Sequence, residues 1–263
     1  MKFKNLVVVF ISIPILAAGI FLVSGCGKGS GGNSEFDNAD IVRGGQLYDK
    51  WWSVSGVLDP NKPTSDNPDY ALTQGTKTGA DTWRCKECHG WDYQGREGAY
   101  KQGSSHFTGV IGLMHASEQD EADELFGTIK DGLQGTGMSS FSSHLADTDI
   151  WDVVKFIKEG IIDDSQYIDY QTKKPLSADA IHGASLFNSV CASCHGSDGK
   201  QINFGDQAEP EYVGTVASDN PWEALHKIRF GQPGTAMPSG IKNNWSIQDC
   251  LDVLGHAQTL PAN

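Results

Sequence analysis

Apolar residues recur at helical spacing in several segments of the chain, and polar residues mark where these segments begin. In residues 39–52, Asp40 stands near the start and the large apolar side chains fall on one helical face: Ile41, Leu47, Tyr48, Trp51 and Trp52. Residues 177–190 repeat the pattern, with Ser177 as the expected N-cap, and lead directly into Cys191. We therefore predict one helix over each segment.

Further helices are predicted from their end signals. Residues 117–132 begin with acidic side chains, which suit the positive end of a helix, and stop at Gly132. Residues 219–231 carry Pro221 in the first turn, where its missing N–H is tolerated. Helices over 145–160 and 245–260 follow, the second ended by Pro261. No segment shows a convincing strand alternation, so the predicted fold class is all-α.

The chain carries one unit twice. ELFGTIKDG (124–132) matches EALHKIRFG (223–231), GTGM (135–138) matches GTAM (234–237), and DIWDVVKF (149–156) matches DCLDVLGH (249–256). Residues 161–175 lack clear periodicity and are predicted to be a linker between the units. Residues 53–82 have no counterpart in the second unit and contain three prolines, so we predict a long surface loop there.

Length and charge add two constraints. The 263 residues allow two ordinary domains, since single domains commonly run to about 100 to 150 residues. The formal net charge of -13 gives a surface that repels nucleic acid and anionic membrane and favours cationic partners or simple solubility. We therefore expect no nucleic-acid partner.

The first 26 residues predict export, because a basic start precedes an apolar run from Leu6 to Val23 and a small-residue ending. The ending at 22–26 resembles the bacterial lipobox. This resemblance implies a signal peptide over 1–25, a lipidated Cys26, and a flexible Gly/Ser-rich tether over 26–35 that holds the body at a membrane. The alternative is an uncleaved single-span anchor, because about 17 to 25 apolar residues can cross a bilayer. Either way, the body lies in an exported compartment where thiols tend to oxidise.

The motif CxxCH occurs at 85–89 and again at 191–195. Cysteines three apart lie on one side of a helical turn, so both thiols can face one flat partner while the histidine binds its centre. This pattern is typical of covalent haem, whose vinyl groups take the two sulfurs as thioethers and whose iron takes the imidazole. A zinc site would need further ligands at one point, and a redox CxxC pair needs no histidine.

Two methionines occupy equivalent loops of the repeat. Met138 and Met237 follow their CxxCH histidines and lie in Gly/Thr-rich turns, whereas Met114 has no counterpart in the second unit and Met1 lies in the signal. Met138 and Met237 are therefore the candidates for the second axial ligand of each iron.

Each unit resembles a class I cytochrome c domain, in which a CxxCH helix, a methionine loop and a C-terminal helix wrap one haem. The resemblance covers residues 36–160 and 176–263 and implies two covalently bound haem c groups. It assigns the thioethers to Cys85, Cys88, Cys191 and Cys194, and the axial ligands to His89, Met138, His195 and Met237.

The resemblance also implies that a glycine and an aromatic residue on the first helix pack against the last helix. Gly45 with Tyr48, and Gly183 with Phe187, match this pattern. Phe156 fits the facing aromatic position of the first unit, whereas the second unit has His256 there. That substitution leaves the packing of the second unit open.

Several other residues have a candidate role beside an ordinary structural one. His144 is the nearest rival to Met138 as a ligand, and the odd thiol Cys250 is expected to pack on the last helix, with haem ligation or a disulfide as alternatives. Aromatic residues around the first motif are expected in the core: Trp83, Trp91, Tyr93 and Tyr100. Basic residues near the methionine loops are candidates for binding haem propionates or a partner: Lys130, Lys227 and Arg229.

An iron held by His and Met has no vacancy for a substrate, so the predicted function is electron transfer between redox protein partners at the cell envelope or periplasm. One alternative is a dihaem oxidoreductase, thiosulfate-dehydrogenase-like or peroxidase-like, with one displaceable distal ligand or a thiolate ligand. Another is a cytochrome subunit of a larger respiratory complex. The identities of donor and acceptor do not follow from the sequence.

Overall fold

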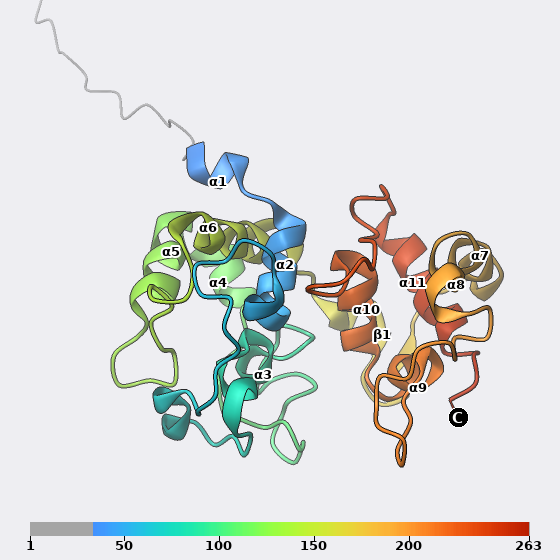
Figure 1. Ribbon diagram of the computed structural model, residues 1–263, viewed down its shortest axis with the longest axis horizontal. Coiled ribbons are helices and arrows are strands. Elements are labelled where there is room, and N and C mark those ends of the chain that lie inside the picture. Colours follow the sequence, from blue (N-terminus) through green and yellow to red (C-terminus); the bar gives the residue numbers. More distant parts are fainter. Residues whose placement is uncertain (1–33, 263) are drawn as a thin grey trace, which may run out of the picture. The chain divides into compact units, whose positions relative to one another are not determined.

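The computed structural model describes residues 34–262 (Figure 1). The predicted signal peptide, Cys26 and most of the predicted tether lie outside these residues. Ser34 and Glu35, the end of the predicted tether, are instead the first residues of a short helix, α1 (Ser34–Asn38). None of the helices in the described part of the chain is both long enough and apolar enough to span a bilayer.

The first half of the body (residues 34–160) is built from helices around one apolar core. The elements after α1 are α2 (Ile41–Lys50), η1 (Trp51–Ser53), η2 (Pro68–Leu72), η3 (Gly79–Trp83), α3 (Cys85–His89), α4 (Met114–Gln119), α5 (Ala122–Asp131), α6 (Asp147–Lys155) and a π-helical turn, η4 (Phe156–Gly160). The prediction for α2 is confirmed, because the Asp40 side chain accepts backbone hydrogen bonds at its start. The helix predicted over 117–132 is divided in two, because Asp120 adopts an extended conformation.

The second half (residues 161–262) begins with the predicted linker, which carries η5 (Asp164–Gln166) and two short antiparallel strands, β1 (Ile168–Asp169) and β2 (Lys174–Pro175). The helices that follow are α7 (Ala180–Leu186), the π-helical turn η6 (Phe187–Cys191), α8 (Ala192–His195), α9 (Val213–Asp219), α10 (Pro221–Phe230) and α11 (Ile247–Ala257). The fold is all-α, as predicted, since these are the only strands named in residues 34–262.

Two predicted helix ends can be compared directly. The N-cap of α7 is Asp179 and not Ser177, since the Asp179 carboxylate accepts hydrogen bonds from the backbone of the first turn. Asp179 thereby matches Asp40 of α2. The end of α10 at Gly231 is confirmed, and that glycine has a positive φ of 80°.

The repeat is visible as the same helix crossing in each half (Figure 1): α2 packs on α6, and α7 packs on α11. A Cβ on Gly44 would lie 1.9 Å from the carbonyl oxygen of Asp152, and a Cβ on Gly183 would lie 1.9 Å from that of Asp252. Gly44, rather than the predicted Gly45, is therefore the glycine that lets the first helix approach the last.

The aromatic contact across this crossing occurs in both halves. The rings of Tyr48 and Phe156 are 5.1 Å apart, and those of Phe187 and His256 are 5.3 Å apart. His256 thus takes the position of Phe156 in an equivalent ring contact. The packing that the sequence left open in the second half is therefore retained.

The segment 53–82 is more ordered than the predicted surface loop. It forms η2 and η3 and buries Tyr70. The hydroxyl of Ser139 lies 2.6 Å from Asn67 Oδ1 and 2.5 Å from Asp69 Oδ2. Because Ser139 follows Met138 directly, this segment supports the first methionine loop.

Helix α2 also contacts the second half of the body. A Cβ on Gly45 would lie 2.5 Å from the ring of Phe230 on α10. Trp91 and Tyr100 belong to the first half but lie in the core cluster formed mainly by the second, together with the fully buried Ile168 of the linker. The two halves therefore share a buried interface.

The close approach at Gly44 predicts a large difference between two glycine variants. Gly44→Ala should lower the free energy of unfolding by about 3 kcal/mol, because the new methyl group would overlap the Asp152 carbonyl. Gly127→Ala is the control, since a Cβ at this helical position would meet nothing within 4 Å, and it should raise stability by about 0.5–1 kcal/mol. Urea unfolding of both variants tests this. Equal changes in the free energy of unfolding of the two variants would contradict the close approach of Gly44 to Asp152.

A second prediction concerns the ion pairs beside each crossing. Arg43 lies 2.6 Å from both Asp149 and Asp152, and at the equivalent place His182 lies 2.8 Å from Asp252. The hydrogen bond to Asp252 raises the pKa of His182 above its usual 6.5. Protonated His182 therefore stabilises the fold below about pH 6.5, and this contribution is lost as the pH rises through the raised folded-state pKa.

His182→Arg should remove that part of the pH dependence, because an arginine stays charged over the whole range, as Arg43 does. The measurement is urea unfolding at a series of pH values from 5 to 9 for both proteins. If the stabilities of the two proteins changed in parallel over this range, His182 would not carry the predicted contribution.

Candidate functional site

Both CxxCH motifs form helical turns that end alike, although Cys85 follows an extended Arg84 and Cys191 continues the π-helical turn η6. Each turn ends at a glycine with positive φ, 83° at Gly90 and 79° at Gly196, a conformation that favours this residue. The carbonyl oxygens of His89 and His195 each accept a backbone hydrogen bond of 2.9 Å, from Gly95 and Gln201 respectively. The chain therefore presents its two Cys-His motifs on equivalent backbone.

The imidazole of His89 is oriented by the backbone. Its Nδ1 lies 2.9 Å from the carbonyl oxygen of Ile111, which can only accept, so Nδ1 carries the proton and Nε2 keeps a free lone pair. Burial lowers the pKa of His89 and of His195, which favours the neutral form that binds metals. The Nδ1 of His195 is buried and has no hydrogen-bond partner among the described residues.

The methionine loops are also built alike. The backbone N–H of Met138 donates to Thr136 Oγ1 at 3.1 Å, and that of Met237 donates to Thr235 Oγ1 at 3.2 Å. Each loop folds back over the glycine that ends the preceding helix, as shown by the position of the Met237 carbonyl 2.6 Å from a Cβ built on Gly231. The structural equivalence predicted from GTGM and GTAM is therefore present.

In the second half these elements line one cavity of about 660 Å³. Its wall contains Cys191, Cys194 and His195 from the motif and Met237 from the loop. The rest of the lining is largely apolar and includes Phe187, Val190, Val213, Val216, Ala217, Ile228, Trp245 and Val253. This size and lining are within the range of cofactor sites. The cavity thus brings together all four residues that the sequence assigned to the second site.

In the first half, two of the four corresponding residues lie against the core. Cys85 and Met138 both pack on the apolar cluster formed by the first half. Burial raises the pKa of Cys85 and of Cys88 to about 12, and that of Cys191 to about 11. A redox-active pair needs thiolates with a lowered pKa. Apolar surroundings suit thioethers instead.

The donor sets also disfavour a small ion at either motif. Within residues 34–262, the one group of three metal-ligating side chains whose ligand atoms lie within 4.8 Å of one another is His182, Asp249 and Asp252. Its equivalent in the first half contains Arg43, so this group is an ion-pair site. The CxxCH residues, the buried imidazole nitrogen and the apolar cavity fit haem c better than zinc.

The two rival ligands have other neighbours in the structure. The ring of His144 is 4.9 Å from that of Trp51 and 4.8 Å from that of Trp83, and its Nδ1 contacts Asp59. Cys250 is buried in the core cluster of the second half and is absent from the cavity lining. Its expected packing role therefore agrees with its position.

The predicted basic candidates differ in their surroundings. Lys130 pairs with Asp147 on the surface, and Arg229 is buried with its guanidinium donating to the carbonyl of Gly160. Among these three candidates, only Lys227 lines the cavity. Two further cations line it that sequence reasoning missed, Lys50 and Arg84, because both belong to the first half and no sequence signal connects them with the second motif.

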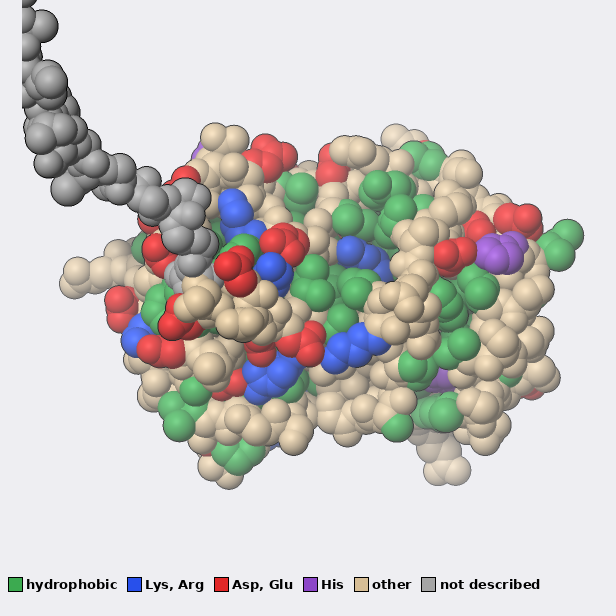
Figure 2. All heavy atoms as spheres, turned by 90° about the horizontal axis from the view of Figure 1, so that it is seen from above, with side chains coloured by type: hydrophobic (Ala, Val, Ile, Leu, Met, Phe, Trp, Pro, Cys, Tyr) green, Lys and Arg blue, Asp and Glu red, His purple; other side chains and the backbone are tan. Residues whose placement is uncertain are grey.

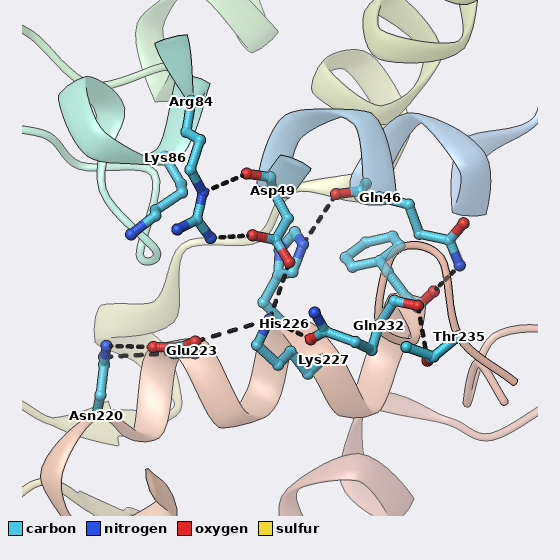
Figure 3. A network of polar contacts seen from close by, with 12 residues as sticks. Gln46, Asp49, Arg84, Lys86, Asn220, Glu223, His226, Lys227, Gln232 and Thr235 are labelled. Carbon is cyan, nitrogen blue, oxygen red and sulfur yellow. Dashed lines mark hydrogen bonds and ion pairs between the residues drawn. The ribbon is translucent and has the colours of Figure 1, made fainter. Parts of the chain in front are cut away.

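Lys227 and Arg84 meet at a buried carboxylate between the halves (Figure 3). Asp49 of α2 is fully buried, with Arg84 at Oδ1 and with Lys227 Nζ 2.9 Å from Oδ2. These two cations lower the pKa of Asp49 despite its burial. The Asp49 side chain is therefore ionised and bridges both halves.

His226 of α10 supports the same interface. Its Nε2 lies 3.0 Å from the carbonyl oxygen of Gly45, and its Nδ1 lies 2.8 Å from the hydroxyl of Tyr93. Burial lowers the pKa of His226 to about 3, so the ring is neutral at ordinary pH. This histidine is an interface residue and not a ligand of the cavity.

Comparison with known proteins identifies two segments. Residues 75–160 match the family model described as cytochrome c, and residues 178–253 match the model described as cytochrome C oxidase, cbb3-type, subunit III. The search of curated proteins gave no significant match. A chain of the reducing HAO-like protein complex of Kuenenia stuttgartiensis is 16% identical over 76% of this chain and 98% of its own, with a TM-score of 0.27, too low to carry an argument.

Each family match contains one CxxCH motif and one of the repeated methionine loops. The matches thereby agree with the repeat, with the paired helix crossings and with the lining of the cavity in the second half. They support a chain of two tandem cytochrome c domains, which implies covalently bound haem c and haem-based electron transfer.

Proposed function

We propose that this protein is a dihaem electron carrier in which each half holds one haem c between a histidine and a methionine. The observation that carries the proposal is the cavity lined by Cys191, Cys194, His195 and Met237. Three of these residues come from one helical turn and the fourth from a loop more than 40 residues later. Such a set suits two thioether bonds and two axial ligands.

The chemistry assigned to the cofactor is the exchange of one electron at the iron of haem c. The role of the protein is to hold the ligands. The hydrogen bond from His89 Nδ1 to Ile111 orients the imidazole, and the Thr136 hydroxyl positions the Met138 loop. A methionine sulfur is a soft ligand that favours Fe(II), and two protein ligands leave no position for a substrate.

The buried interface supports electron transfer between the two sites of one molecule. Asp49 pairs with a cation from each half, and His226 bonds to the backbone of α2. These contacts hold the sites at constant separation. The rate of transfer between cofactors depends on the distance between them, which loosely tethered domains would vary.

The proposed location is the cell envelope or periplasm of a bacterium, with Cys26 as the lipid attachment to a membrane. The lipobox-like ending at residues 22–26 supports this, as does the export expected of cytochrome c domains. The proposed partners are redox proteins that donate and accept electrons. With a net charge of -13, a partner with a basic docking face is favoured, although the face shown in Figure 2 mixes acidic and basic side chains.

One alternative keeps a specific observation in its favour. The match of residues 178–253 to an oxidase-subunit model supports a fixed cytochrome subunit of a larger respiratory complex. Co-purification with other chains at all concentrations would favour the subunit. The thiosulfate-dehydrogenase-like or peroxidase-like alternative drew support from Cys250 as a thiolate ligand, and the buried position of that thiol in the core removes this support.

The ligand assignment predicts the effect of removing each methionine. Met138→Ala and Met237→Ala should each open one iron, so that about half of the haem binds carbon monoxide and the potential of that haem falls. Met114→Ala is the control, since Met114 packs against the core and has no counterpart in the repeat. Absorption spectra of the reduced proteins with carbon monoxide measure this. A Met237→Ala spectrum identical to wild type would show that the ligand was misassigned.

A further inference from the structure

Three cations line the cavity of the second half, although the chain carries a net charge of -13. Lys227 belongs to the second half, whereas Lys50 and Arg84 come from the first. Two acidic side chains, Glu211 and Glu223, also line the cavity. Basic side chains from another half of the molecule are not needed to close an apolar pocket, so their presence requires an explanation.

Two of these three cations already have carboxylate partners within the protein. Lys227 is engaged by Asp49 at 2.9 Å, by Gln232 at 2.5 Å and by Glu223 at 3.6 Å. Arg84 pairs with Asp49 and, at 3.3 Å, with Asp81. Each oxygen of the Asp49 carboxylate is thus used by a cation other than Lys50.

Lys50 is the one cation of these three that has no ion-pair partner among the described residues. It is the last residue of α2 and is half-buried, and its ammonium group makes no hydrogen bond or ion pair with the residues that the structure describes. Burial lowers the pKa of Lys50, and so do the positive charges of Arg84 and Lys227, whereas the carboxylates of Asp49 and Asp81 act in the opposite direction. A half-buried ammonium beside two other cations is stabilised by a further anion that it can contact directly.

The chemistry of the cavity indicates which anion this is. The walls around Cys191 and Cys194 are largely apolar, and they suit the ring of a porphyrin. Haem c also carries two propionate carboxylates, which need charged or polar partners when they are buried. The positively charged partners in the lining are Lys50, Arg84 and Lys227, which we call the cationic rim. Polar side chains are also present at Gln232, Thr235 and Trp245.

We infer that Lys50 and Arg84 of the first half bind the propionate carboxylates of the second haem, so that the second cofactor site is completed by the first half. This inference rests on the proposed function. Arg84 is also bonded directly to Cys85, the first thioether residue of the other site. Arg84 is therefore next to the first proposed thioether of the first haem and also belongs to the cationic rim around the second.

The inference has a measurable consequence for the second haem. A positive charge at Lys50 stabilises the reduced iron relative to the oxidised one, because reduction lowers the positive charge of the haem. Lys50→Gln should therefore lower the equilibrium constant for reduction of the second haem by about tenfold, which is about 59 mV for a one-electron couple. The first haem should change less.

The test is a spectroelectrochemical titration of the full-length protein with both haems counted beforehand. Lys50→Arg keeps the charge and should retain the wild-type potential, and Lys62→Gln, at an exposed position of the first half, is the matched control. Lys50→Met, similar in length but uncharged, should reproduce the fall even if the Gln variant folds poorly. Resonance Raman bands of the propionates should shift in the uncharged variants alone.

The outcomes separate the two proposals. If both haems are present and the second haem of Lys50→Gln and of Lys50→Met titrates like that of Lys62→Gln, the role of Lys50 is overturned while the dihaem assignment stands. If the second motif carries no haem, the proposed function fails, and this inference fails with it. A fall in the potential of the second haem that Lys50→Arg reverses supports the inference.

Discussion

The arrangement of the molecule depends on one buried carboxylate. Asp49 is fully inaccessible to solvent, and a carboxylate in that position is stable only when its charge is balanced. Arg84 supplies one cation from the first half, and Lys227 supplies the other from the second. Loss of either partner from a buried pair costs about 3–5 kcal/mol. The halves are therefore held in one relative position near Asp49.

With the halves in this relative position, residues of α2 and the residue before the first motif line the cavity of the second half. Lys50 follows Asp49 and reaches the second cavity, while Arg84 precedes Cys85 and reaches the same cavity. Gly45, on the same helix, allows Phe230 to approach. Helix α2 thus has two functions. Gly44 allows the helix crossing of the first half, whereas Asp49 and Lys50 at the C-terminal end contribute to the interface and to the cationic rim.

The features that sequence alone predicted are local or repeated. The CxxCH turns, the methionine loops, the N-cap Asp40 and the end at Gly231 each follow from residues close together in the chain or from the internal match. The missed features join distant residues. Asp49 and Lys227 are 178 positions apart, and no periodicity relates them. Gly44 lies against the Asp152 carbonyl and Gly45 lies against the ring of Phe230. The residues next to these two glycines in the sequence do not indicate which one makes which contact.

The central claim is that each CxxCH motif attaches one haem by its two cysteines. Mass spectrometry of the purified protein and of its proteolytic peptides tests this most directly. The account predicts a mass increase of two haems, with one on the peptide that contains Cys85 and Cys88 and one on the peptide that contains Cys191 and Cys194. Free thiols, a disulfide or a zinc adduct at Cys191 and Cys194 would contradict it.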